Sequence, residues 1–390
     1  MTAPVETKRT LETGPNGSRP LVTVTRCEQY DSARVRAAVR RLLEPLGWMG
    51  AFVRAGDVVL LKPNMLSAKE PDRAVTTHPV VLEAVVREVQ EAGGEVWIGD
   101  SPPQPNRVRH YWKATGFQEV AERTGARLVS FETSGVEERR LGDWTYHLAL
   151  PVLEADVIIN LPKLKTHNLT LLTAAVKNMF GCVPGGEKGN FHRWAPHPDD
   201  FAERLVDVFE LTKPRLTLLD GIVGMHGNGP ASGDPAPMGI LAASASAPAV
   251  DVLAARALGL AEDEVATITA AAKRGLGPAK LSELELQIVD DAGLSLPLGK
   301  FKLPGNRLLK RVPRPLLRFV GEHTWLRPVA NHDRCTQCGI CASACPVGAI
   351  EMDGYPKFDY DTCITCWCCS ESCPFDAIEV QKSLLAKLLA

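Results

Sequence analysis

The 390-residue sequence lacks an uninterrupted apolar run of about 18 residues, the length that a membrane-spanning helix requires. It has no Gly-x-Gly-x-x-Gly after its first predicted strand and no Gly-x4-Gly-Lys-Ser/Thr, so neither a dinucleotide fingerprint nor a P-loop is present. No motif for a nucleophilic serine or cysteine occurs. The net charge is only −2, and no basic face with interleaved aromatic residues is present, so nucleic acid is not an expected partner.

Cysteine is scarce in most of the chain, where only Cys27 and Cys182 occur, whereas nine of the eleven cysteines lie in the last 60 residues. The first 19 residues are polar and contain no apolar signal core, so a secreted, disulfide-bonded protein is not expected. We expect a cytoplasmic protein. The clustering of the cysteines predicts a metal-binding module.

The cysteine-rich segment repeats one spacing, Cys-x2-Cys-x2-Cys-x3-Cys-Pro, beginning at Cys335 and again at Cys363. This spacing is typical of bacterial-type ferredoxins with two 4Fe–4S clusters, in which the fourth cysteine of each run binds the other cluster. The cysteines expected at the first cluster are Cys335, Cys338, Cys341 and Cys373. Those expected at the second cluster are Cys363, Cys366, Cys369 and Cys345. Because this crossed ligation joins both halves, the module needs its clusters to fold.

Structural zinc is the alternative, but paired cysteines would leave the third cysteine of each run and the closing prolines unexplained. Cys368 lies inside the second run beside Cys369 and is not required as a ligand. It is either a structural thiol or a group that tunes the neighbouring cluster.

Alternating strands and helices predict an α/β body over residues 21–290, with a mostly parallel sheet in one or two lobes, followed by a small α+β ferredoxin-like domain. The clearest unit is a strand at 57–62, a helix that begins at Pro79 and stops at Gly93, and a strand at 95–99. Other strands are expected at 21–26, 127–131, 155–161, 215–220 and 239–243, and a hairpin around 144–150. Other helices are expected at 31–46, 117–124, 170–180, 200–212, 248–259 and 263–274, with glycine-rich loops at 184–189 and 221–233.

Polar residues follow four of these strands, and lysines among them have no role in forming turns. Ligands of open parallel sheets bind at the carboxyl ends of the strands, so we expect these side chains to form one site. The residues expected to bind substrate are Lys62, Asn64, Asp100, Ser101, Lys165, Asn178, Asp220 and His226. The residues expected to act in catalysis are His167, His78, Lys163 and Lys177.

The lysines suit a small anionic substrate, and a histidine such as His167 or His78 could supply a proton, since histidine titrates near neutral pH. Histidines near this edge could instead bind an additional metal together with Asp100 or Asp220. A flavin in the body is a further alternative.

The remaining segments connect or flank these units. Residues 1–20 are expected to be a disordered lead-in, residues 291–329 a proline-containing basic linker, residues 330–380 the ferredoxin-type domain and residues 381–390 a C-terminal helix. The linker either clasps the body or forms a docking surface for an acidic redox partner or an anionic lipid surface. Its basic residues are Lys300, Lys302, Arg307, Lys310, Arg311, Arg314 and Arg318.

Several longer motifs accompany the strand ends. They are Lys62-Pro63-Asn64, Thr76-Thr77-His78-Pro79, Gly99-Asp100-Ser101-Pro102, the stretch Asn160-Leu161-Pro162-Lys163-Leu164-Lys165-Thr166-His167, the stretch 176–185 and the stretch 220–225. On these motifs residues 55–275 resemble the family described as domain of unknown function 362, which is often fused to a ferredoxin module. The resemblance implies an iron–sulfur protein and no particular reaction. The Thr-Thr-His-Pro and Gly-Asp-Ser stretches are also similar to those of nickel-pincer lactate racemases, from which no residue role is taken.

These observations favour an iron–sulfur oxidoreductase in which an external low-potential donor passes electrons through two clusters to a small anionic substrate in the body. A non-catalytic electron-transfer or metallocentre-maturation protein that acts on a partner is the second hypothesis. An enzyme of non-redox chemistry, with structural or sensing clusters, is the third.

Overall fold

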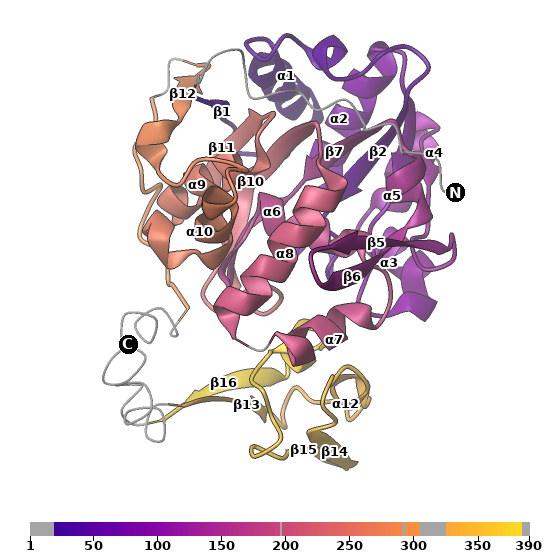
Figure 1. Ribbon diagram of the computed structural model, residues 1–390, viewed down its shortest axis with the longest axis vertical. Helices are drawn as coiled ribbons and strands as arrows, with labels where there is room; N and C mark the ends of the chain where they lie inside the picture. The colour runs from indigo at the N-terminus through magenta and orange to yellow at the C-terminus, as the bar shows by residue number, and fades with distance from the viewer. Residues whose placement is uncertain (1–18, 196, 291–292, 305–324, 384–390) are drawn as a thin grey trace.

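The body is built on one ten-stranded sheet in the order β12-β1-β11-β10-β7-β2-β3-β4, with β8 beside β10 and β9 beside β8. The computed structural model describes residues 19–195, 197–290, 293–304 and 325–383 (Figure 1). The strands are β1 (Leu21–Arg26), β2 (Val58–Pro63), β3 (Glu95–Ile98), β4 (Arg127–Leu128), β7 (Val157–Leu161), β8 (Lys163–His167), β9 (Leu171–Thr173), β10 (Leu216–His226), β11 (Asp234–Ser244) and β12 (Glu285–Ile288). A separate hairpin is formed by β5 (Val136–Leu141) and β6 (Trp144–Ala149).

Strands β10, β7, β2, β3 and β4 run parallel to one another, whereas β11 is antiparallel to both β10 and β1. The prediction of a mostly parallel sheet is therefore confirmed, and the strands form a single sheet. Because parallel strands end at a common edge, the residues that follow β2, β3 and β7 lie at the same end of the body.

Helices cover both faces of the sheet, and successive strand residues point to opposite faces. Val59 and Leu61 of β2 pack in the core with α1, α2 and α4, whereas Leu60 packs in the core with α6, α8 and α9. The helices of the body are α1 (Ser32–Leu43), α2 (Pro79–Glu91), α3 (Val108–Ala114), α4 (Phe117–Thr124), α5 (Leu150–Glu154), α6 (Ala175–Asn178), α7 (Glu187–Trp194), α8 (Pro198–Thr212), α9 (Ala247–Leu258) and α10 (Ala266–Lys273).

The helix starts follow from local chemistry. Asp31 precedes α1, and its carboxylate accepts a hydrogen bond of 2.9 Å from the backbone N–H of Arg34. Helix α2 begins at Pro79, whose missing N–H costs nothing at this position, and the ring of His78 accepts a hydrogen bond from Val80 N. The predicted starts of both helices are confirmed.

Three segments differ from expectation. Strand β10 continues through the predicted glycine-rich loop as far as His226, because it stays paired with β11 over this length. A Cβ on Gly224 would lie 2.3 Å from the sulfur of Met238 and 2.7 Å from Leu164 O, so glycine permits this close packing. The segment before α6 forms β8 and β9 in place of a loop and the start of a helix, and α7 already begins at Glu187 in the predicted loop.

The C-terminal domain contains two short antiparallel pairs and two four-residue helices (Figure 1). Its elements are β13 (Leu326–Ala330), α12 (Ile340–Ser343), β14 (Ile350–Asp353), β15 (Tyr355–Phe358), α13 (Cys368–Glu371) and β16 (Ile378–Lys382). The predicted C-terminal helix does not begin at residue 381, because Gln381 and Lys382 pair with β13 in strand β16.

Some expectations concern segments outside the described residues. Residues 384–390, most of the predicted lead-in and residues 305–324 of the basic linker belong to this group. Within the described ranges, no helix is both long and apolar enough to cross a membrane.

Candidate functional site

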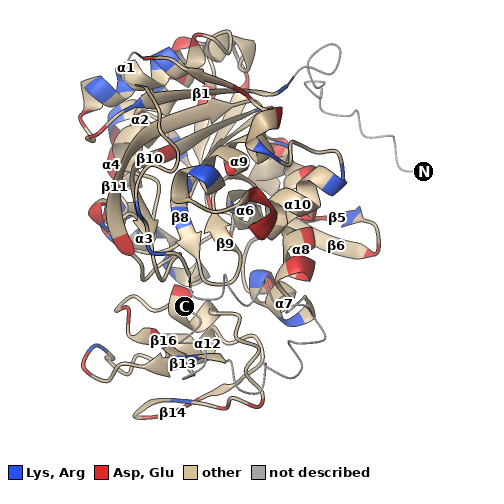
Figure 2. Cartoon of the chain, turned by 90° about the vertical axis from the view of Figure 1, so that its left-hand side faces the viewer, with Lys and Arg blue, Asp and Glu red and all other residues tan. Residues whose placement is uncertain are grey.

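A cavity of about 270 Å³ lies between the carboxyl edge of the sheet and the C-terminal domain. Strands β8 and β9 lie on the side of the body that faces this domain (Figure 2). The body contributes four lysines to the cavity lining, which are Lys62, Lys165, Lys177 and Lys188. The C-terminal domain contributes residues 343–346, Cys368 and Glu371. The cavity is therefore walled by both domains and carries an excess of cationic side chains.

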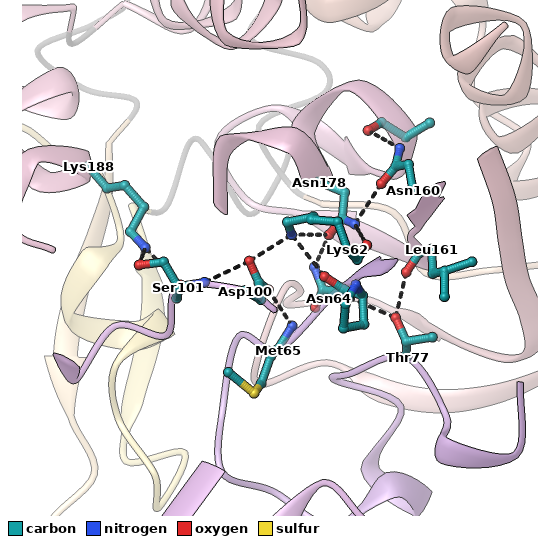
Figure 3. Close-up of polar contacts among 12 residues, drawn as sticks. Lys62, Asn64, Met65, Thr77, Asp100, Ser101, Asn160, Leu161, Asn178 and Lys188 are labelled. Atoms are coloured by element: carbon teal, nitrogen blue, oxygen red, sulfur yellow. Dashed lines mark hydrogen bonds and ion pairs between the residues drawn. The ribbon is translucent and has the colours of Figure 1, made fainter. Parts of the chain in front are cut away.

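Lys62 stands at the end of β2 and is almost completely buried. Its ammonium lies 2.8 Å from a carboxylate oxygen of Asp100, and it donates hydrogen bonds to Pro63 O (2.9 Å) and to the amide oxygen of Asn178 (3.2 Å) (Figure 3). The second oxygen of Asp100 accepts a hydrogen bond of 2.7 Å from Met65 N. This buried ion pair is fully hydrogen-bonded, which is the condition for burying charge at low cost.

Lys165 is also buried and donates to the amide oxygen of Asn64 (3.0 Å) and to Val75 O (2.7 Å). Burial lowers the pKa of Lys165 well below its usual range, and the neighbouring Lys177 lowers it further. The Asn64 amide in turn donates to Asn178 Oδ1 at 2.9 Å, so the two lysines of β2 and β8 are joined through one amide network.

Lys177 differs from these lysines because its ammonium makes no hydrogen bond or ion pair within the described residues. Burial lowers the pKa of Lys177, while the negative charge of Glu371 opposes this effect. His192 of α7 lines the same cavity and stacks on Phe201 at 4.1 Å between ring centroids. Lys177 and His192 thus present polar groups that no described side chain engages.

Glu371 brings a carboxylate from the C-terminal domain to this part of the body. Its Oε1 lies 3.1 Å from Nε2 of His167, and neither atom has a hydrogen-bond partner elsewhere among the described residues. Burial alone would raise the pKa of Glu371, but His167 and Lys177 lower it to about 2. Nδ1 of His167 accepts hydrogen bonds from Leu169 N and Thr170 N, so this histidine is neutral with its proton on Nε2.

Three predicted site residues lie together outside the cavity. Lys163 lies 2.9 Å from Asp220 and donates to the hydroxyl of Tyr30 at 2.7 Å, and Tyr30 donates to Asp220 at 2.9 Å. Asp220 also accepts a hydrogen bond from the backbone N–H of His78, whose ring stacks on Tyr30 at 3.5 Å. Burial lowers the pKa of Lys163 and raises that of Tyr30. These contacts connect β10 to the start of α2.

His226 does not line the cavity, and its Nδ1 accepts a hydrogen bond of 2.9 Å from the backbone N–H of Lys302. The predicted residues that line the cavity are Lys62, Asn64, Asp100, Ser101, Lys165, Lys177 and Asn178. His167 does not line the cavity, but it contacts Glu371, which does.

The cysteines of the C-terminal domain fit the ligand sets expected from their spacing. Four of them surround one small hollow and are Cys335, Cys338, Cys341 and Cys373. In the other group, Cys366 and Cys345 are close enough to Cys363 to raise its pKa, after the larger effect of burial, and Cys363 and Cys366 act likewise on Cys369. The fourth cysteine of each run therefore lies beside the other run, as crossed ligation requires.

Among the described residues, no three His, Cys, Asp or Glu side chains converge as a single metal ion would require. Cubane ligands stand further apart than this, since four irons and four sulfides separate them. The additional metal or flavin in the body stays a prediction. Cys368 lines the cavity and is adjacent in sequence to Cys369, an expected cluster ligand, whereas Cys182 is completely buried.

Glu371 and residues 343–346 were not among the residues predicted for this site, because the two domains were expected to be separate units. Glu371 is the one acid within the two cysteine runs, and this is the feature that could have identified it. Helix α7 brings His192 and Lys188 to the cavity.

Neutral buried histidines predict acid lability of the fold. Burial lowers the pKa of His78 and His167 to about 4 and that of His192 to about 3, from 6.5. Below pH 6.5 these histidines become protonated in the unfolded chain but stay neutral in the folded chain. The free energy of unfolding is therefore highest above pH 6.5 and falls on acidification. Each histidine contributes a slope of about 1.4 kcal/mol per pH unit.

The measurement is the melting midpoint of the anaerobic protein between pH 7.5 and 5, followed by far-ultraviolet circular dichroism together with cluster absorbance. His192→Gln should flatten the dependence. A midpoint that does not change with pH, while the clusters remain intact, would contradict the assignment of neutral histidines.

Comparison with known proteins agrees with this two-part architecture. The model of the family described as Domain of unknown function (DUF362) matches residues 59–256, and the 4Fe-4S binding domain model matches residues 328–351 and 356–379. Thylakoid-associated protein sll1697 of Synechocystis sp. (strain ATCC 27184 / PCC 6803 / Kazusa) is 40% identical over 260 residues, which cover 66% of this chain and 80% of that protein.

A solved structure, the lactate racemase apoprotein from Thermoanaerobacterium thermosaccharolyticum, is similar with a TM-score of 0.40 and 12% identity. The match covers 63% of this chain and 58% of the racemase chain. The family-model match spans the sheet and helices that form the body side of the cavity. The chain therefore belongs to the DUF362 family and carries a 4Fe–4S ferredoxin domain after its α/β body.

Proposed function

We propose that the protein is an iron–sulfur reductase that binds a small anionic substrate in the cavity between its two domains. One observation carries this proposal: Cys345, an expected ligand of the second cluster, lines the same cavity as the four lysines. The bound clusters supply electrons one at a time from an external low-potential donor. A substrate in the cavity would lie beside the second cluster without an intervening cofactor.

The free groups of the cavity indicate where the anion binds. Lys62 and Lys165 already have fixed protein partners, so they are not free to act as direct ligands. Lys177 and His192 have no such partners among the described residues and are the groups that a carboxylate could engage. Charge-assisted hydrogen bonds from buried groups are stronger than those at a surface.

The two clusters would then have different positions in the path of the electrons from the donor to the substrate. The cysteines of the first cluster include the exposed Cys338 and lie beside Phe375, whose side chain is 45% exposed. We assign the entry of electrons to this exposed side and their delivery to the side of Cys345.

Lys177→Met is expected to weaken anion binding by roughly 10- to 100-fold, because a hydrogen bond to a charged group contributes about 1.5–3 kcal/mol. The measurement is the electron paramagnetic resonance spectrum of the dithionite-reduced protein titrated with oxalate, which should change in the wild type at much lower oxalate than in the variant. Lys113→Met, on the exposed face of α3, is the matched control.

The reaction is tested with reduced methyl viologen as donor and a panel of 2-oxo and 2,3-unsaturated carboxylates as acceptors. Acceptor-dependent oxidation of viologen is the expected result. If no acceptor is reduced and oxalate leaves the spectrum unchanged, the reductase proposal fails and the non-catalytic electron carrier takes its place.

A further inference from the structure

A short hydrogen-bonded chain connects the cavity with the half-exposed residue Glu132. Lys188 of α7 donates hydrogen bonds to the backbone oxygen of Ser101, at 2.7 Å, and to its hydroxyl. The Ser101 hydroxyl donates in turn to the carboxylate of Glu132. Lys188 and Ser101 both line the cavity, where Lys188 reaches toward the loop after β3 (Figure 3). Three groups that can carry a proton are thus in direct contact.

Lys188 is placed where its proton is available near neutral pH. Burial lowers its pKa to about 8; the carboxylates of Asp100 and Glu132 oppose this effect, Lys62 adds to it, and Cys182 opposes it weakly. These groups come from the ends of β2 and β3, from the segment after β4, and from the turn before α7. At neutral pH the group is an ammonium that can lose its proton more readily than an exposed lysine.

The histidines are poorer donors in this arrangement. Burial keeps His167 and His192 neutral, with pKa values of about 4 and 3, and a neutral imidazole gives up its remaining proton only with difficulty. The ring of His167 faces Glu371 and two backbone N–H groups, and His78 lies in the cluster with Tyr30 outside the cavity.

We propose that Lys188 is the proton donor to the bound substrate and that Glu132 returns a proton to it through the Ser101 hydroxyl. This inference rests on the proposed reductase function. For each electron that the substrate accepts from the external donor by way of the clusters, the ammonium of Lys188 transfers one proton to the substrate. The resulting amine takes a proton from the Ser101 hydroxyl, and the hydroxyl is restored by a proton that the Glu132 carboxylate first receives from solvent and then passes on, so that all three groups end as they began. Lys188 is then a catalytic residue, and Ser101 and Glu132 are relay residues.

The amine can be tested without a known substrate. Pyridoxal 5′-phosphate, an anionic aldehyde, is reduced onto accessible amines with borohydride at pH 6 to 10, and labelled lysines are quantified by peptide mass spectrometry. Lys188 should be labelled with a midpoint near pH 8. Glu132→Gln should move this midpoint to lower pH, because the carboxylate favours the ammonium. The exposed Lys113 provides the internal reference for the reagent. Absence of label at Lys188, or an unchanged midpoint in Glu132→Gln, would overturn the relay.

Steady-state kinetics distinguish a proton-donor role of Lys188 from a purely electrostatic role. With the acceptor found in the viologen panel, Lys188→Met and Lys188→Arg should both lower kcat by at least roughly 100-fold with little change in KM, since arginine keeps the charge but does not release its proton. Restoration of kcat by arginine would overturn the donor assignment. If the wild type reduces no acceptor, the reductase proposal fails, and with it the donor role, while the labelling profile separately reports the state of Lys188.

Discussion

Gly181→Ala is expected to destabilise the protein by about 3–5 kcal/mol, the usual cost of breaking a buried ion pair on one side. A Cβ at this position would lie 1.9 Å from the carboxylate of Asp100 and 2.8 Å from the ammonium of Lys62. Asp100 cannot move away freely, because it accepts hydrogen bonds from Met65 N and Ser101 N. The added methyl group therefore separates the pair and leaves charge without a partner in the cavity wall.

The measurement is unfolding of the anaerobic protein in urea. Gly186→Ala is the matched control, since this glycine has an ordinary backbone conformation with φ of −72° and a Cβ there would meet nothing within 4 Å. Its free energy of unfolding should stay within about 1 kcal/mol of the wild type. Equal stability of Gly181→Ala and the wild type would show that the Lys62–Asp100 pair is not held as described.

Cys345→Ala is expected to remove the cluster beside the cavity and to lower the iron content from about eight to about four per chain. Crossed ligation predicts that the remaining cluster is the one held by the first three cysteines of its own run, from Cys335, together with Cys373. This cluster lies away from the cavity, so oxalate should no longer change the spectrum of the reduced protein.

Cys373→Ala is the mirror variant. It should also retain about four irons, but in the cluster beside the cavity, and the response to oxalate should persist. If Cys345→Ala kept the oxalate response and Cys373→Ala lost it, each cluster would be held within its own cysteine run. Loss of all iron in both variants would instead show that the domain folds only with both clusters.

Much of the site followed from strand polarity alone. Lys62 and Asp100 end two neighbouring parallel strands, and their predicted convergence is observed as an ion pair of 2.8 Å. The same rule did not separate Lys163 from Lys165, which are two residues apart on β8 and should share a face. The register between β8 and β10 shifts from Asp220 opposite Lys163 to Met225 opposite Lys165, so the two lysines meet different partners. An irregularity of this kind depends on tertiary packing that a strand pattern does not contain.

The contribution of the C-terminal domain to the site could not be predicted from the sequence either. The cysteine spacing predicts which residues bind iron, but nothing in it states which side of the ferredoxin domain meets the body. Lys69 and Asp376 form one contact between the domains, while His167 and Glu371 form another. These long-range pairs are made by residues that are ordinary surface types in isolation, so their burial could not be predicted.

The two cysteine runs have the form of an internal duplication. They differ at positions where the second run contacts the body. Helices α12 and α13 occupy equivalent places, and the residue before each has a left-handed backbone, with φ of 72° at Gly339 and 68° at Trp367. Glycine adopts this conformation without strain, whereas tryptophan does so at a cost of about 1–3 kcal/mol. Trp367 is 5% exposed and packs in the core of the body.

The second copy also has Glu371 where the first has Ser343, and Cys368 where the first has Ile340. In these three of the differing positions, the second copy has a tryptophan that packs in the core of the body, a carboxylate that lines the cavity and a thiol that lines the cavity. The module is thus asymmetric: the first copy reaches the cavity only with residues 343–346, whereas the second copy adds a carboxylate and a thiol to the cavity and a tryptophan to the core of the body.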